Sequence, residues 1–447
     1  MASEWRILSL QEAKVALIDC DHRTPPPSTS GYPYVAIPQL RNGRINFSDA
    51  RRITFENYKD WTRKALPIEH DVVLSRRCNP GETAFVSSDV EFALGQNLVL
   101  LRADGTEVYP PFLRWLVRGS EWWEQIGKFL NVGAVFDSLR CADVPKFQLP
   151  IPPQDEQRAI AHILGTLDDK IELNRRMNET LEAMARALFQ SWFVDFDPVR
   201  AKAAVRREHP RWTDAEVCRA ALPTLSPEIA ALFPDSFEDS PLGPIPKGWQ
   251  LLPLPEAINV NPSRPLRKGA VAPYLDMANM PTQGHSADEV VQREFNSGMR
   301  FMNGDTLVAR ITPCLENGKT AFVDFLDENQ VGWGSTEYIV LRPKPPLPNE
   351  FAYCLARSAD FRDFAIQSMT GSSGRQRVPA ESLSHFKITS PSEPIAKLFG
   401  GSVEPLFVRA GQAAKESRTL AALRDTLLPK LISGEIRLSH NGELKES

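Results

Sequence analysis

The sequence is poor in the residues that build disulfides, metal sites and membrane spans. Its six cysteines are scattered without any Cys-x-x-Cys pair, which argues against a disulfide framework or a zinc site. Its seven histidines show no metal-ligand spacing. No apolar run reaches the length of a membrane span, and no signal peptide is recognisable. We therefore expect a cytoplasmic protein that makes no contact with a membrane.

Catalytic motifs are missing too. The sequence has no Gly-x-Ser-x-Gly, no glycine-rich dinucleotide loop and no Asp/Asn-Pro-Pro-aromatic motif of amino-methyltransferases. Gly318-Lys319-Thr320 resembles the end of a P-loop. However, Pro313 stands where the first glycine of that motif would fall, and the residues that follow favour a strand. We expect the chain itself to carry no catalytic residue, no metal and no cofactor.

The charge balance identifies no class of partner. The 447 residues include 52 basic and 56 acidic side chains, for a net charge of −4. A near-neutral total does not exclude a nucleic-acid partner, because a local basic face matters more than the sum. The length predicts two or three domains.

The most informative positive feature is an internal repeat at a spacing of about 240 residues. Six short matches occur in the same order in both halves, and that order is hard to obtain by chance. The matches are residues 5–13 with 249–257, 33–35 with 273–275, 71–74 with 305–308, 81–86 with 318–323, 100–102 with 340–342, and Phe147 with Phe386. The chain is therefore predicted to contain two related domains.

Each predicted domain has short β-rich apolar runs followed by a helical stretch. The runs are 72–74, 83–86 and 98–101 in the first copy and 306–308, 320–323 and 338–341 in the second. The helical stretches are 111–129 and 349–368. The predicted fold class is α+β, with two repeated mixed α/β domains separated by two long antiparallel helices that form a coiled-coil spacer.

The two long helices are predicted from heptad-like spacing. After the prolines at 150–153, apolar residues recur every three or four positions, which predicts one helix of about 35 residues and about 50 Å. A second segment, 393–431, has a similar length and period. The seam is expected at Ile160, Leu164, Leu167, Ile171, Leu181, Leu188, Leu406, Leu420 and Leu427. A long helix folded onto its own domain is the alternative.

We expect a first domain at 1–154, a long helix at 155–197, a proline-rich linker at 198–243, a second domain at 244–391, a second long helix at 392–440 and a tail at 441–447. The linker has no counterpart after the second helix. Short helical pieces are predicted within it at 214–221 and 228–232.

Arginine-rich polar loops in both domains are candidate DNA contacts. Arginine and glutamine can pair with guanine and adenine edges, and serine or glycine amides suit phosphates. The alternative is ordinary solvated surface. The candidates are Arg41, Arg44, Arg51, Arg52, Arg76, Arg77, Arg310, Thr312, Lys319, Ser372, Ser373, Arg375, Gln376 and Arg377.

Several runs resemble one known family. Pro150-Ile-Pro-Pro-Gln-Asp-Glu-Gln, Leu167-Asp-Asp-Lys-Ile-Glu-Leu-Asn and Phe189-Gln-Ser-Trp-Phe-Val-Asp-Phe are similar to the central conserved region of specificity subunits of type I restriction–modification enzymes. Residues 242–249 resemble the lead into their second target recognition domain. Residues 309–322 and 334–337 resemble segments within such domains, and 423–435 resembles the end of their distal conserved region.

This resemblance implies a division of labour. Each target recognition domain would read one half of a bipartite, asymmetric site in double-stranded DNA. The helices would set the spacing, up to roughly 15 base pairs, and dock two methyltransferase (modification) subunits, with restriction/translocase subunits completing the complex. The chain would be non-catalytic, with S-adenosylmethionine, ATP and Mg on the partner subunits.

Two rival readings remain. The chain could be a non-catalytic protein-binding scaffold with two β-rich modules on a coiled-coil spacer, which would show no salt-dependent DNA binding. It could also be a nuclease with an unrecognised site, which would cut DNA by itself in the presence of a metal.

Overall fold

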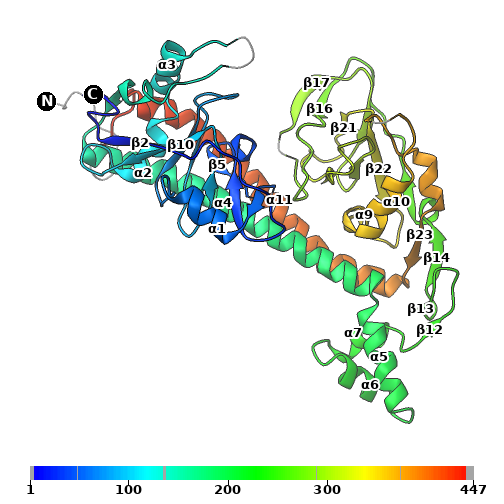
Figure 1. Ribbon diagram of the computed structural model, residues 1–447. Helices are drawn as coiled ribbons and strands as arrows, with labels where there is room; N and C mark the ends of the chain where they lie inside the picture. The colour runs from blue at the N-terminus through cyan, green and yellow to red at the C-terminus, as the bar shows by residue number, and fades with distance from the viewer. Residues whose placement is uncertain (1–4, 48, 134–136, 288, 373, 439–447) are drawn as a thin grey trace. The chain divides into compact units, whose positions relative to one another are not determined.

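The structure of the protein is a computed structural model that describes residues 5–47, 49–133, 137–287, 289–372 and 374–438. The candidate residue Ser373 and the expected tail at 441–447 lie outside these ranges. The chain divides into two units (Figure 1): Met1–Ile171 with Thr419–Ser447, and Glu172–Arg418. Each unit contains part of both long helices.

The first unit is built on a four-stranded antiparallel sheet in the order β2-β10-β7-β8 and a three-stranded sheet in the order β6-β3-β9. Its strands are β1 (Arg6–Ser9), β2 (Val15–Asp19), β3 (Tyr32–Val35), β4 (Leu40–Arg41), β5 (Arg44–Ile45), β6 (Arg51–Ile53), β7 (Val72–Ser75), β8 (Thr83–Phe85), β9 (Ala93–Leu94), β10 (Leu98–Ala103) and β11 (Gln148–Ile151). Its shorter helices are η1 (Ile37–Gln39), α1 (Phe55–Thr62), α2 (Pro110–Leu116), α3 (Ser120–Phe129) and η2 (Val144–Lys146). β1 pairs with β11, which brings the two ends of the domain together.

Both faces of the four-stranded sheet are buried. Successive side chains of a strand point to opposite faces. Accordingly, Val72 and Leu74 of β7 lie in one apolar core with α2 and α3. Val73 lies in a second core with residues of β3 and β9. This two-sided burial explains why the strands read as continuous apolar runs rather than alternating ones.

The second unit repeats this architecture, which confirms the predicted repeat and fold class. Its sheets have the orders β15-β22-β19-β20 and β17-β16-β21-β18, and β14 pairs with β23 as β1 pairs with β11. Its strands are β12 (Phe237–Glu238), β13 (Ile245–Pro246), β14 (Gln250–Pro253), β15 (Ile258–Val260), β16 (Val271–Leu275), β17 (Val291–Glu294), β18 (Met299–Phe301), β19 (Thr306–Ala309), β20 (Thr320–Phe322), β21 (Gly332–Gly334), β22 (Tyr338–Pro343) and β23 (Lys387–Ser390). Its shorter helices are α8 (Leu254–Ala257), α9 (Asn349–Arg357), α10 (Ala359–Gln367) and η4 (Ala380–His385).

One buried ion pair recurs in both copies. In the first copy, Arg102 Nε donates to Asp71 Oδ1 at 2.7 Å, and the other carboxylate oxygen of Asp71 accepts from a backbone N–H. In the second, Arg342 Nε donates to Asp305 Oδ1 at 2.6 Å, and Asp305 also accepts from a backbone N–H. Both aspartates are buried. This shared pair belongs to the scaffold that the two domains have in common.

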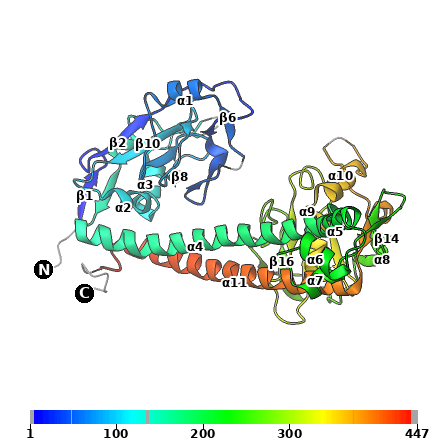
Figure 2. The same ribbon diagram turned by 90° about the horizontal axis from the view of Figure 1, so that it is seen from below.

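The long helices are α4 (Gln154–Phe189) and α11 (Glu393–Ile432). In the first unit, Leu164 of α4 shares an apolar core with Leu431, near the end of α11. In the second unit, Phe189 packs against Phe399, near the start of α11, with ring centroids 6.2 Å apart. Within each unit the two helices are therefore antiparallel (Figure 2).

The seam between these helices is partly polar. Ile160 and Leu164 are buried as expected, whereas the other predicted positions on both helices are only half-buried: Leu167, Ile171, Leu181, Leu188, Leu406, Leu420 and Leu427. Buried positions on α4 include Asp168, Asn174 and Glu182. The amide of Asn174 donates to Glu416 Oε2 at 2.8 Å on α11. A search for regularly spaced apolar residues cannot find such buried polar side chains, because their hydrogen-bond partners lie on distant segments of the chain.

The range expected as a linker is largely helical. It contains most of α5 (Asp197–Glu208), and then α6 (Asp214–Ala221) and α7 (Pro227–Leu232). Before it, the expected long helix ends in η3 (Gln190–Val194), a short π-helix. α6 and α7 occupy the places of the two predicted helical pieces. α5 was not predicted, because the long helix was expected to end at 197 and a proline-rich linker to begin at Pro198. Proline is, however, well suited to a first helical turn. Among the described residues, no helix is both long and apolar enough to cross a membrane.

Candidate nucleic-acid interface

A tight hairpin presents two of the candidate arginines. Asn42 and Gly43, with φ of 52° and 77°, form the turn between β4 and β5, and positive φ at both central residues suits a two-residue hairpin. Arg41 and Arg44 stand opposite each other across it. Arg41 is exposed and pairs with Asp49 at 3.1 Å.

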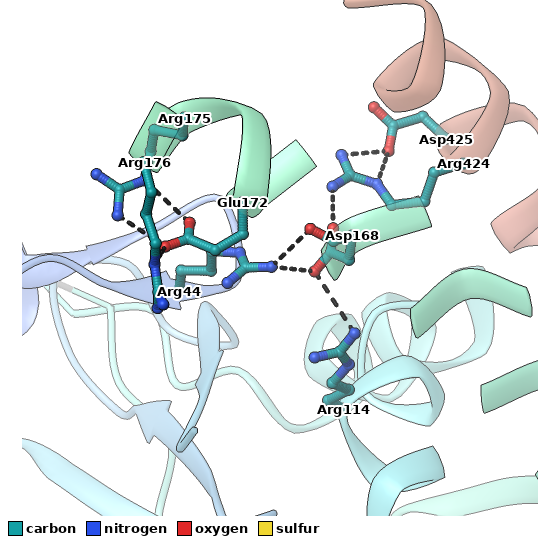
Figure 3. Close-up of polar contacts among 8 residues, drawn as sticks. All are labelled: Arg44, Arg114, Asp168, Glu172, Arg175, Arg176, Arg424 and Asp425. Carbon is teal, nitrogen blue, oxygen red and sulfur yellow. Dashed lines mark hydrogen bonds and ion pairs between the residues drawn. The ribbon is translucent and has the colours of Figure 1, made fainter. Parts of the chain in front are cut away.

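Arg44 points instead to α4. Its guanidinium donates to the carboxylate of Asp168 at 3.1 Å and to the backbone oxygen of Asp168 at 3.0 Å. Arg114 of α2 and Arg424 of α11 lie 3.6 and 2.5 Å from the same carboxylate. Figure 3 shows the three guanidinium groups converging on Asp168. The hairpin is therefore anchored on the helices of its own unit by a buried charge cluster.

The charges of this cluster depend on one another. Burial lowers the pKa of Arg114 to about 10, and nearby Asp168 acts in the opposite direction. The Arg114 guanidinium also packs over the ring of Phe85, 4.2 Å from its centroid. Removing Asp168 would leave buried positive charge without a partner, which is more costly than losing an exposed ion pair.

A hollow of about 880 Å³ lies beside Arg41 in the first unit. Its rim combines guanidinium, amide and backbone groups, the kinds of group that pair with base edges and phosphates. Its lining includes Gln39, Arg41, Arg51, Asn79, Gln96 and Asn97. Arg51 is exposed, while the neighbouring Arg52 donates to the backbone oxygen of Gly31 at 3.1 Å.

Arg76 and Arg310 occupy equivalent positions in the two domains. Arg76 directly follows β7, and Arg310 directly follows the repeat-related β19. The N–H of Arg76 donates to the backbone oxygen of Asn97 at 3.0 Å, and that of Arg310 to the backbone oxygen of Glu337 at 2.9 Å. Asn97 and Glu337 therefore correspond.

At each of these two arginines, a third segment of the chain pairs with the residue that follows the arginine. Arg77 forms an isolated β-bridge with Ser138, and Ile311 forms the equivalent bridge with Arg377. We call Arg76, Asn97 and Ser138 the first strand-end site, and Arg310, Glu337 and Arg377 the second strand-end site.

The second strand-end site contains a tight ion pair. Arg377 Nε donates to Glu337 Oε1 and Oε2 at 2.8 and 3.0 Å, and its Nη2 lies 2.8 Å from Oε1. Arg310 Nε lies 3.9 Å from Oε2 of the same carboxylate. The two guanidinium groups thus share one acid.

The first strand-end site has the same backbone pairing, but neutral residues replace the two members of the ion pair. Asn97 and Ser138 stand where the second site has Glu337 and Arg377. Arg76 Nη1 donates to the backbone oxygen of Leu139 at 3.4 Å. The Nε atoms of both Arg76 and Arg310 are buried and have no hydrogen-bond partner among the described residues.

The remaining candidates differ in how far the protein itself engages them. Ser372 and Arg375 are exposed on the loop before Arg377, and the backbone oxygen of Gln376 accepts from the N–H of Thr312 at 3.0 Å. Lys319 instead donates to the backbone oxygens of residues 277 and 278 at 2.5 and 3.2 Å. Arg77 is exposed at the first strand-end site.

Asn97, Ser138 and Glu337 were not among the predicted DNA contacts, although Glu337 belongs to the segment 334–337 that resembles the family. None of the three stands in an arginine-rich loop, and each gains its place only through backbone pairing with another segment. Extending the repeat alignment past its matched runs would have paired Asn97 with Glu337, since each directly precedes the last strand of its sheet.

One group of possible metal ligands exists among the described residues. The ligand atoms of Asp19, Cys20 and His22 lie within 4.8 Å of one another. However, burial and the charge of Asp19 raise the pKa of the Cys20 thiol to about 12. The thiol also lies 3.2 Å from the backbone oxygen of Gly95, to which it can donate. The thiol therefore stays protonated at neutral pH and is occupied by this backbone contact.

The structure therefore shows two related α+β domains, each with its own strand-end site, and two long helices that run antiparallel within each unit. The sequence family described as "Type I restriction modification DNA specificity domain" matches residues 27–183. The specificity subunit of the type I restriction enzyme HindI from Haemophilus influenzae is 26% identical, with 91% of this chain and 95% of that subunit covered. The MjaIX specificity subunit from Methanocaldococcus jannaschii is 24% identical, with 87% and 82% covered.

A solved structure has the same fold. The S subunit of a type I restriction–modification system from M. genitalium aligns over 96% of both chains with a TM-score of 0.53 at 16% identity. Over most of its length, the chain is therefore similar in sequence to type I restriction–modification specificity subunits.

Proposed function

We propose that this protein is the DNA sequence-specificity subunit of a type I restriction–modification complex. Each recognition domain reads one half of a bipartite, asymmetric DNA site. The observation that carries the proposal is the repeat: the two domains share strand order and a buried ion pair, yet differ in the side chains at their strand-end sites. One scaffold with two sets of polar side chains suits two different half-sites.

We assign the DNA contacts to side chains around the hollow and around the two strand-end sites. In the first domain these are Arg41, Arg51, Arg76 and Arg77, around the hollow and the strand-end site. In the second they are Arg310, Thr312, Ser372, Arg375, Gln376 and Arg377. Arg44, Arg52 and Lys319 lie outside the hollow and the strand-end sites and donate to acceptors within their own units, so we assign them the role of holding the loops in place.

The long helices are proposed to set the spacing of the two readouts and to dock two methyltransferase subunits. Large apolar side chains on α4 and α11 that remain exposed support a docking role, because an isolated chain gains nothing by leaving them in water. They are Leu173, Met184, Val408 and Leu423.

Catalysis belongs to the partners in this proposal. Methylation with S-adenosylmethionine and DNA cleavage driven by ATP and Mg take place on the methyltransferase and restriction/translocase subunits. The working boundaries are recognition domains at 1–154 and 244–391, with the helical segment 198–243 between the central helix and the second domain.

Co-expression with the cognate methyltransferase subunit, followed by sequencing for modified adenines, tests this function. We expect a single split motif with two different halves, methylated only when this chain is present. A stable complex without any modification, together with no salt-dependent DNA binding, would favour a protein-binding scaffold instead.

A further inference from the structure

The two copies of the domain separate scaffold contacts from contacts that can encode sequence. The pairs Asp71–Arg102 and Asp305–Arg342 have the same partners in both copies, as expected for contacts that the fold requires. The strand-end sites share their backbone pairing and their first arginine. They differ at the other two positions, where the fold itself demands no particular side chain.

Arg377 is the most constrained side chain at these differing positions. Its Nε and Nη2 are held by both oxygens of Glu337, and its Nη1 donates to the backbone oxygen of Arg375 at 3.3 Å. Even so, 42% of its side chain is exposed. A guanidinium has five N–H donors in a rigid plane. The donors that point away from Glu337 therefore remain available in a fixed orientation.

Glu337 has little capacity left for a ligand of its own. Both of its oxygens accept from Arg377, and Arg310 adds a second positive charge 3.9 Å away. Its side chain is 22% exposed, about half the exposed fraction of Arg377. The geometry therefore makes Arg377 the group that meets DNA and Glu337 the group that holds it.

We propose that Arg377 reads a guanine in the half-site of the second domain and that Glu337 is its positioning residue. Two parallel N–H donors of arginine match the O6 and N7 acceptors of guanine in the major groove. A guanidinium already held in place loses less conformational entropy on binding. The first domain has Ser138 at this position, so its half-site is read there without an arginine fork. This inference rests on the proposed function.

The test uses the full chain co-expressed with its methyltransferase subunit and measures base preference at every position of the methylated motif. The variants are Arg377→Ala, Arg377→Lys, Glu337→Ala and Glu337→Gln. Arg377→Lys keeps the charge but loses the fork, so it should lose the guanine even if Arg377→Ala fails to fold. The matched control is Arg293→Ala, which removes an exposed arginine on β17 of the same unit, outside the proposed DNA contacts.

Both Arg377 variants should lower the preference for guanine at one position by roughly tenfold or more, with the other half-site unchanged. Glu337→Ala should lower it less, and Glu337→Gln, which keeps one acceptor, should restore part of it. Arg293→Ala should leave the motif as it is.

An unchanged motif in both Arg377 variants would overturn the inference. So would an equal loss of affinity for all sequences, because that is what a purely structural role predicts. Failure of the proposed function has a different signature, since the wild-type complex itself would then yield no motif.

Discussion

Arg76 and Arg310 are the same residue at equivalent positions of the two domains, whereas the side chains around them differ. Both follow a central strand of their sheets, and both bury an Nε that has no hydrogen-bond partner among the described residues. A phosphate is present whatever the base sequence, so a contact common to both domains suits the DNA backbone.

Replacing either arginine by alanine should therefore weaken DNA binding of the assembled complex about equally for all sequences. The slope of log affinity against log salt should fall by about 1 for each variant, as expected for the loss of one phosphate contact. The motif should stay the same. Fluorescence anisotropy over a series of salt concentrations measures both quantities.

Arg409→Ala is the matched control, because Arg409 is exposed on α11 and outside both strand-end sites. Its salt slope should equal that of the wild type. A shift of the methylated motif in Arg310→Ala would instead show that this arginine reads a base.

Single residues also mark the limit of sequence reasoning. Arg41 and Arg44 lie three positions apart and looked equivalent, yet Arg41 remains exposed while Arg44 is anchored on Asp168. The acceptor of Arg44 lies 124 positions away along the chain. No local pattern could have told which arginine the fold would use for its own cohesion.

At the scale of elements, the first turn of α4 fastens both ends of the first unit. Buried Glu156 accepts from Arg437 Nε at 2.7 Å, from the N–H of Leu438 at 3.1 Å and from Trp5 Nε1 at 3.1 Å. Burial by itself would raise the pKa of Glu156, but these hydrogen bonds outweigh it and hold the pKa below its ordinary value of 4.5.

A carboxyl group whose pKa is depressed by folding stabilises the protein above its unfolded pKa. That contribution is lost as the pH falls through the folded value. The melting temperature of the wild type should therefore fall more steeply below about pH 4.5 than that of Glu156→Gln. At pH 7 the variant should be less stable by roughly 1.5–3 kcal/mol, the range for hydrogen bonds to charged groups.

Melting curves between neutral and acidic pH measure this difference. Glu124→Gln, an exposed substitution on α3 of the same unit, should follow the wild type. Parallel melting profiles for the wild type and Glu156→Gln at all pH values would show that Glu156 does not supply the acid-sensitive stability.

The helix elements themselves were predictable, while the details of their seam were not. Apolar spacing identified α4 and α11 because helical periodicity is a local property. The same spacing favoured Leu167, which is half-buried, over Asp168, which is buried. A search for regularly spaced apolar residues cannot find a buried aspartate. Asp168 is stable in this position because Arg44, Arg114 and Arg424 pair with it.

At the scale of the whole molecule, the proposal requires an intact helix pair for assembly. Replacing both Leu167 and Ile171 by aspartate should loosen the helix pair in the first unit. Both side chains are half-buried on α4, so each substitution would move a negative charge partly out of water. The methyltransferase subunits should then dissociate, and size-exclusion chromatography would show the free subunits.

Thr166→Asp is the control for this experiment, since Thr166 is exposed on the same turn of α4. Its complex should elute like the wild type. An intact complex with the double variant would mean that the methyltransferase subunits dock elsewhere than on this part of the helix pair.

The sequence by itself determined the repeat, the α+β class, the two long helices and the family resemblance. These properties follow from the linear order and spacing of residue types, which can be read without knowing any distant contact. Only the tertiary structure decided that Glu337 holds Arg377, that Asp168 gathers three arginines and that Asn97 corresponds to Glu337. The physical reason is that a buried or half-buried charge must find an opposite partner, and that partner can come from any segment the fold brings near.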